Sequence, residues 1–161
     1  MSPSTSFPPP ARPASILIAV IDWHALLPHK PPMRLLEEIV DLRPGELAVA
    51  RRVTHETDFY FQGHFPGDPI VPAVILVEML AQAGGLAAGA PRTGGPQVPV
   101  ALRVAGLGPF KFPSAARAGD VLEARARVVG QLGGLYKIEG EVAVAGRTVA
   151  AGAVTLARTE P

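Results

Sequence analysis

Hydrophobic and polar residues alternate along the C-terminal third of the chain. Across residues 121–129 every second side chain is apolar and charged side chains lie between them, as in a strand with one buried face. Residues 136–144 repeat this alternation after a Gly-Gly turn within residues 131–134. Ala145-Gly146 then turns the chain into a third run, residues 147–156. The pattern predicts an antiparallel meander of three strands.

A different pattern marks residues 72–90, which are apolar on every face of a helix except at Glu78 and Gln82. The proline that opens this segment suits the start of a helix, and a helix without a polar face has to be buried on all sides. Residues 47–54 are predicted to form a further strand. We therefore expect an α+β domain in which a long central helix is wrapped by an antiparallel sheet.

Glycine and proline are frequent, with 17 and 18 of the 161 residues. Such a surplus without a repeat would suggest disorder, but 48% of the residues are apolar, only 18% are charged and the mean hydropathy is +0.26. Five of the prolines fall within residues 1–13. We therefore expect residues 1–20 to form a flexible, proline-rich tail and residues 21–161 to form a single domain.

Charge, cysteine content and the length of apolar runs argue against several classes of function. The net charge of +1 comes from 15 basic and 14 acidic residues without a block of like charge, which argues against nucleic-acid or membrane partners. The absence of cysteine excludes disulfides, thiolate metal sites and a cysteine nucleophile. The apolar runs are far shorter than the roughly 18 residues that span a bilayer. We expect a soluble cytoplasmic protein.

Glu78 and Gln82 lie four residues apart, and therefore on one face of the predicted helix. A carboxylate among apolar side chains, with no Lys or Arg on its own helix, is costly to bury. We expect its pKa to be raised unless a partner reaches it from another part of the chain. A surface Glu at a helix edge is the alternative, but no polar stripe surrounds Glu78. Perturbed carboxyl groups concentrate in active sites.

His64 lies just before this helix, in a loop where three prolines recur at every third residue. Such a loop is rigid and holds a histidine outside helix and sheet. A lone histidine is more often a structural hydrogen-bonding group, but a histidine paired with a perturbed carboxyl can remove and return protons. His24, His29 and His55 are weaker candidates because they show no metal-site spacing, and we expect no metal.

The segment GHFPGDPIVPAVILVEMLAQ, residues 63–82, resembles the signature of the (3R)-hydroxyacyl-acyl carrier protein dehydratases of type II fatty acid synthesis, which have a hot-dog fold. The motifs LLPHKPP at 26–32, FKF at 110–112 and AGD at 118–120 also match that family, so the resemblance covers roughly residues 22–157. It implies a long central helix wrapped by a curved antiparallel sheet. It also makes residues 33–42 a strand, although their own pattern fits a helix equally well.

The resemblance further implies a reaction and an assembly. The family forms homodimers, or trimers of dimers, in which His64 of one subunit would face Glu78 of the other. His64 would take a proton from C2 of a 3-hydroxyacyl thioester. Glu78 would act at the C3 hydroxyl, either as an acid or by orienting a water. The enolate oxygen would bind free backbone N–H groups at Ala73 and Val74, near the start of the helix.

Other residues follow from the same resemblance. Ala73 stands where the family has Gly, and Glu37-Glu38 stands where relatives commonly carry Asp-Arg. No cofactor is expected, and the partner is acyl carrier protein, which is acidic and would bind a basic rim. The expected lining of the acyl tunnel is Phe61, Phe65, Leu76, Leu80 and Gln82. The expected members of the basic rim are Arg103, Lys111 and Arg117.

Two alternatives stay open at this level. A hot-dog thioesterase would activate water with a helix carboxylate and would not need His64. A non-catalytic subunit that binds acyl carrier protein would keep the apolar groove without turnover, and Ala73 is the only residue that favours it. Fatty acid synthesis and polyketide or polyene assembly would use the same two residues, so the sequence does not separate these pathways.

Overall fold

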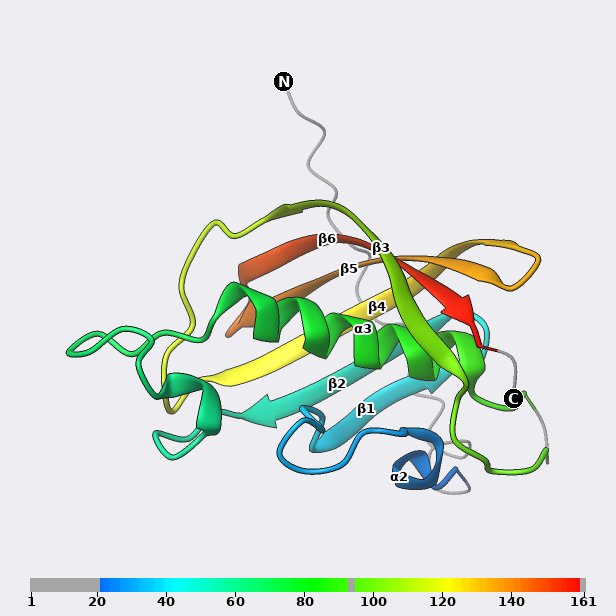
Figure 1. Cartoon of the computed structure of the whole chain (residues 1–161), viewed down its shortest axis with the longest axis horizontal. Coiled ribbons are helices and arrows are strands. Elements are labelled where there is room, and N and C mark those ends of the chain that lie inside the picture. Colours follow the sequence, from blue (N-terminus) through cyan, green and yellow to red (C-terminus); the bar gives the residue numbers. More distant parts are fainter. Residues whose placement is uncertain (1–20, 93–94, 160–161) are drawn as a thin grey trace.

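The computed structural model describes residues 21–92 and 95–159 and consists of one helix wrapped by one sheet (Figure 1). The long helix α3 spans Ala73–Gly89, and α2 (Trp23–Leu26) and the 3-10 turn η1 (Phe59–Phe61) are short. All six strands pair antiparallel, in the order β1-β2-β4-β5-β6-β3. Their bounds are Glu38–Arg43 (β1), Leu47–Val53 (β2), Leu102–Lys111 (β3), Val121–Leu132 (β4), Leu135–Val144 (β5) and Arg147–Arg158 (β6). The predicted α+β architecture is confirmed.

The meander predicted from alternation is present as β4, β5 and β6, which are neighbours in the sheet. The turn between β5 and β6 has positive φ at both central residues, 48° at Ala145 and 79° at Gly146. Two-residue hairpin turns of this type match the twist of the strands that they join. The predicted strand at 47–54 is also confirmed, as β2.

Helix α3 packs against one face of the curved sheet, as Figure 1 shows. Its buried residues include Met79, Leu80 and Leu86, and all three are fully enclosed. Gly140 on β5 permits this close approach, because a Cβ there would lie 2.2 Å from the Arg125 carbonyl oxygen and 2.7 Å from Leu80 Cδ1. The helix can therefore rest almost directly on the sheet backbone.

The strand expected at 33–42 is only partly present. Residues 38–43 form β1, but residues 33–37 are not strand. The reason is that the side chain of Gln82 on α3 forms hydrogen bonds with two backbone groups of this segment. Its Nε2 donates to Met33 O (2.7 Å), and its Oε1 accepts from Leu35 N–H (2.9 Å). The backbone that the resemblance assigned to the sheet is partly bonded to the helix instead.

The tail expected over residues 1–20 lies outside the described residues. Within the described part of the chain, no helix is both long enough and apolar enough to cross a membrane.

Candidate active site

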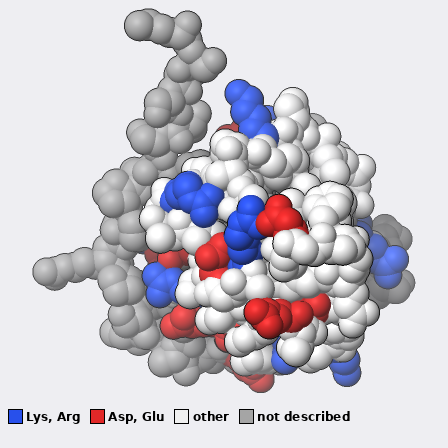
Figure 2. Space-filling model, turned by 90° about the vertical axis from the view of Figure 1, so that its left-hand side faces the viewer, with Lys and Arg blue, Asp and Glu red and all other residues white. Residues whose placement is uncertain are grey.

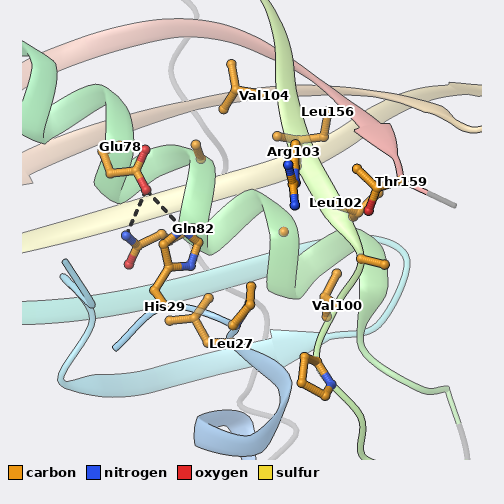
Figure 3. Close-up of a pocket in the computed structure, with 15 residues that line it drawn as sticks. Leu27, His29, Glu78, Gln82, Val100, Leu102, Arg103, Val104, Leu156 and Thr159 are labelled. Carbon is orange, nitrogen blue, oxygen red and sulfur yellow. Dashed lines mark hydrogen bonds and ion pairs between the residues drawn. The ribbon is translucent and has the colours of Figure 1, made fainter. Parts of the chain in front are cut away.

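Glu78 projects from the middle of α3 into a cavity of about 580 Å³ (Figure 3). Its Oε1 lies 3.0 Å from Gln82 Nε2 and 3.1 Å from His29 Nε2, while its side chain is 27% exposed. Figure 3 shows these two contacts meeting at the same carboxylate oxygen. Oε2 has no hydrogen-bond partner among the described residues, so one oxygen of Glu78 is held and the other is free.

Gln82 holds its end of this arrangement rigidly. It is 1% exposed, and its bonds to Met33 O and Leu35 N–H fix which end of the amide donates. Its Nε2 donates both to Met33 O and to Glu78 Oε1, because these oxygens can only accept. The placement of residues 78 and 82 on one helix face is confirmed. The two hydrogen bonds of Gln82 to the loop before β1 hold it in that position.

The pKa of Glu78 is lowered overall, although its burial acts to raise it. Hydrogen bonds from His29 and Gln82, together with the charge of His29, outweigh that burial. The expected rise was conditional on the absence of a partner from elsewhere in the chain, and such a partner is present. At neutral pH the arrangement therefore favours the ionised carboxylate.

His29 is the residue that sequence reasoning undervalued. It has no metal-site spacing to the other histidines, yet it lies within the LLPHKPP motif that carried part of the resemblance, and that motif was the available signal. The loop that follows α2 places its ring against Glu78, 49 residues further along the chain. Its Nδ1 is buried and has no hydrogen-bond partner among the described residues.

The rest of the cavity wall is mainly apolar. It comes from α3, from the loop before β1, from residues 99–104, which lead into β3, and from Leu156 and Thr159 at the end of β6. Gly85, two turns of helix beyond Glu78, forms part of this wall, and a Cβ added there would meet nothing within 4 Å. The labelled apolar members in Figure 3 are Leu27, Val100, Leu102, Val104 and Leu156.

Most of the expected tunnel residues lie elsewhere. Leu76, Leu80 and Phe61 are buried in the hydrophobic core, and Phe65 is 54% exposed. Only Gln82 of that set lines the cavity beside Glu78. The role of the other four in substrate binding stays a prediction.

His64 is fixed in its loop by reciprocal bonds with Ile70. The ring Nδ1 lies 3.1 Å from Ile70 O, and Ile70 N–H donates to His64 O (3.2 Å). A carbonyl only accepts, so Nδ1 carries the hydrogen and Nε2 of the neutral ring is free to take a proton. His64 does not line the cavity that contains Glu78. A single subunit therefore does not bring the two predicted catalytic residues together in one cavity.

The start of α3 offers backbone donors. The N–H groups of Ile75 and Leu76 both bond to Pro72 O, whereas those of Ala73 and Val74 have no partner among the described residues. Both of these residues are exposed. The only non-glycine residue with positive φ in the described chain is Ala145, so Ala73 is in a conformation that any residue adopts. The alanine that replaces the family glycine imposes no backbone strain here.

Of the three basic residues expected to form a rim, Arg103 and Lys111 lie near opposite ends of β3, and the rim itself stays a prediction. Arg103 lines the Glu78 cavity, and Lys111 lies eight residues further along β3, roughly 26 Å away for an extended strand. Arg117 forms an ion pair with Asp68. Figure 2 shows acidic and basic side chains interspersed on the end of the molecule that it views. No group of three or more potential metal ligands occurs among the described residues.

Residues 27–153 match the family model of FabA-like domains. A curated relative, the 3-hydroxyacyl-[acyl-carrier-protein] dehydratase FabZ of Chloroflexus aggregans, is 34% identical over 90% of this chain and 99% of its own length. The FabZ of Ruminiclostridium cellulolyticum is 35% identical over 84% of this chain and 93% of its own length.

Solved structures with the same fold include the dehydratase heterocomplex ApeI:P from Xenorhabdus doucetiae. That structure has a TM-score of 0.66 at 20% identity and covers 86% of this chain and 91% of its own. The E. coli PaaI protein has a TM-score of 0.59 at 20% identity and covers 75% of this chain and 82% of its own. Likeness at this level of identity bears on the fold alone, and it confirms the hot-dog fold that the resemblance implied.

Proposed function

The chain belongs to the FabA-like domain family, and we propose that it eliminates water from 3-hydroxyacyl thioesters on acyl carrier protein, as its FabZ relatives are named for doing. The observation that carries this proposal is Glu78, a carboxylate with one oxygen held and the other free in a largely apolar cavity. We place the reaction in fatty acid biosynthesis. No described residue favours a polyketide or polyene pathway over it.

His64 is the base in this proposal. Its Nδ1–H is bonded to Ile70 O, which leaves the Nε2 lone pair to take the proton from C2 of the thioester. Bonds on both the ring and the backbone keep that nitrogen in one orientation. A well-placed proton-transfer group contributes about 10²–10⁴-fold to the rate.

Glu78 acts at the C3 hydroxyl as a carboxylate. Its lowered pKa disfavours the role of a neutral acid, so of the two roles expected from the resemblance we favour the orienting one. Oε2 accepts a hydrogen bond from the C3 hydroxyl or from a water beside it. After C2 has lost its proton to His64, the C3–O bond breaks, and His64 gives that proton to the leaving hydroxyl oxygen so that water departs. The protein ends in its starting protonation state.

The thioester oxygen, which gains negative charge as C2 loses its proton, is placed at the N–H groups of Ala73 and Val74. These donors have no other partner among the described residues and lie at the positive end of the α3 dipole. The acyl chain runs from Glu78 past Gln82 to Gly85, a distance of about 10 Å along the helix axis.

A second copy of the chain completes the site in this proposal. Strand β3 is an edge of the sheet, and its Val104 and Leu107 are 46% and 58% exposed. Val74 on α3 is 72% exposed, which is unusual for a helix without a polar face. Pairing of two β3 edges would cover these side chains and allow His64 of one copy to approach Glu78 of the other. Dimers and trimers of dimers both satisfy this requirement.

Subunit mixing tests the shared site. His64→Ala and Glu78→Gln homodimers are each expected to be inactive, and exchange of their subunits should restore about a quarter of the wild-type activity, because half of the dimers then hold one intact site. Incubation uses a (3R)-3-hydroxyacyl thioester of acyl carrier protein, with loss of water followed by mass. Mixtures that exchange subunits but stay inactive would refute the sharing of sites between subunits.

The same incubation with the wild type separates the alternative functions. Release of free thiol would favour a thioesterase, and tight binding of the carrier protein without any product would favour a non-catalytic subunit.

A further inference from the structure

His29 makes a polar contact that the dehydration mechanism above does not use. Its Nε2 lies 3.1 Å from Glu78 Oε1, and the two side chains are 31% and 27% exposed. A carboxylate oxygen can only accept, so Nε2 carries the hydrogen in this contact. Nδ1 is buried without a partner among the described residues, and an N–H in that position would be left unsatisfied. His29 therefore donates to Glu78 through Nε2.

We propose that His29 is a positioning residue that, together with Gln82, holds Glu78 Oε1 so that Oε2 alone faces the substrate. This inference rests on the proposed dehydratase function. Two donors from different parts of the chain, the loop before β1 and α3 itself, converge on one oxygen. Rotation of the carboxylate would break both bonds, so the free oxygen keeps a single direction.

The electrostatic surroundings of this pair are simple. Arg103, from the start of β3, is the other charged side chain that lines the cavity among the described residues. Lys30, the next residue in the loop, is exposed. In the proposed dimer, His64 of the second copy is a further titratable neighbour. The effect of His29 is therefore separable from these groups by substitution of His29 alone.

The substitutions His29→Ala and His29→Gln test the role. His29→Ala is expected to lower kcat about tenfold to a hundredfold with a smaller change in KM, because Oε2 loses its fixed direction. It also removes an interaction that lowers the pKa of Glu78, so the acidic limb of the kcat/KM profile should move to higher pH. His29→Gln keeps an N–H donor and should recover part of kcat. His55 is an exposed histidine outside the cavity, so His55→Ala is the matched control. It should leave kcat and the acidic limb of the kcat/KM profile unchanged.

A second readout does not need turnover. Titration of ¹³C-labelled carboxyl groups, with the Glu78 signal assigned through Glu78→Gln, should show a higher pKa for Glu78 in His29→Ala than in the wild type. Absence of dehydration by the wild type would overturn the proposed function, whereas this titration would still report on His29. The positioning role is wrong if folded His29→Ala and His29→Gln both keep the wild-type kcat, the acidic limb and the Glu78 titration.

Discussion

Glu78 and Asp58 are both carboxylates with a lowered pKa, and each lies beside a cavity, yet their hydrogen bonding differs. Burial raises the pKa of Asp58, but bonds from His55 N–H, the Tyr60 hydroxyl and Arg52, with the Arg52 charge, lower it overall. Its Oδ1 accepts from Arg52 (2.5 Å), and its Oδ2 accepts from Tyr60 (2.8 Å) and from His55 N–H (2.9 Å). Both oxygens of Asp58 are therefore occupied.

Glu78 has three features in common with Asp58: partial burial, a lowered pKa and an adjacent cavity, which is about 580 Å³ for Glu78 and about 470 Å³ for Asp58. None of these features separates a reactive carboxylate from a structural one. The difference is that Glu78 Oε2 has no partner among the described residues. A free oxygen in a largely apolar cavity is what marks Glu78 as the candidate for chemistry.

The largest expected effect is on activity. Glu78→Gln removes the carboxylate that orients the C3 hydroxyl, and kcat/KM for a 3-hydroxyacyl carrier-protein thioester should fall about 10²–10⁴-fold. Asp58→Asn is the matched change at the carboxylate whose two oxygens are both bonded. The kcat of this variant, calculated per folded molecule, should stay within a few-fold of the wild-type value. Formation of the enoyl thioester, followed by mass, measures both. Equal losses of kcat in the two variants would remove the distinction.

Stability should depend more on the enclosed carboxylate of Asp58 than on an exposed one. Asp58→Asn removes one of the two carboxylates that pair with Arg52, whose side chain is 12% exposed and keeps its ion pair with Glu37, and the free energy of unfolding should fall by about 1–3 kcal/mol. Glu139→Gln breaks an exposed pair with Lys137 and should change it by less than about 1 kcal/mol. Urea unfolding followed by circular dichroism measures each. An Asp58→Asn variant as stable as the wild type would mean that the network around Asp58 contributes little.

The two cavities should differ in their effect on substrate choice. Gly85→Leu adds a side chain to the wall of the Glu78 cavity at a position where a Cβ meets nothing within 4 Å. The kcat/KM for a 3-hydroxydodecanoyl substrate should then fall about tenfold relative to a 3-hydroxybutyryl one. Thr57→Leu fills part of the cavity beside Asp58 and should leave that ratio unchanged. Competition between the two substrates measures the ratio. An unchanged preference in Gly85→Leu would place the acyl chain elsewhere.

The smallest expected effect is the pH dependence of stability that arises from ionisation of Tyr60. Burial, first among several contributions, raises its pKa to about 12, and Asp58 accepts its hydroxyl hydrogen. Because the folded value lies above the usual 10.0, the stability that this contributes is present below pH 10 and is lost as pH rises through about 12. Tyrosinate absorbance of the wild type and of Tyr60→Phe isolates the step. If Tyr60→Phe instead loses a titration step near pH 10, the pKa of Tyr60 is not raised and this prediction is wrong.

Local patterns predicted much of this fold. The meander follows from alternation within residues 121–156, and α3 follows from its apolar run after Pro72. Strand β3 was not predicted by its pattern, because two glycines and a proline within it hide the alternation. Its partner β6 also lies some fifty residues further along the chain. Residues 33–37 were misassigned because Gln82, a tertiary partner, bonds the backbone at Met33 and Leu35.

The candidate site also has features that the sequence predicts and features that depend on tertiary contacts. Residue types and their spacing in the sequence predicted His64, Glu78 and Gln82. The direction of the Glu78 pKa could not be predicted, because it depends on His29, which only the folded chain brings to that carboxylate. The contact between His64 and Glu78 was expected from the family resemblance alone, and it stays a prediction.

The central claim is that this chain dehydrates carrier-bound 3-hydroxyacyl thioesters through His64 and Glu78. Its most direct test is intact-mass analysis of a (3R)-3-hydroxyacyl carrier protein incubated with the wild type, His64→Ala or Glu78→Gln. The account predicts a substrate lighter by one water with the wild type, and little or no change with either variant. An unchanged mass with the folded wild-type dimer, or equal water loss with all three proteins, would contradict it.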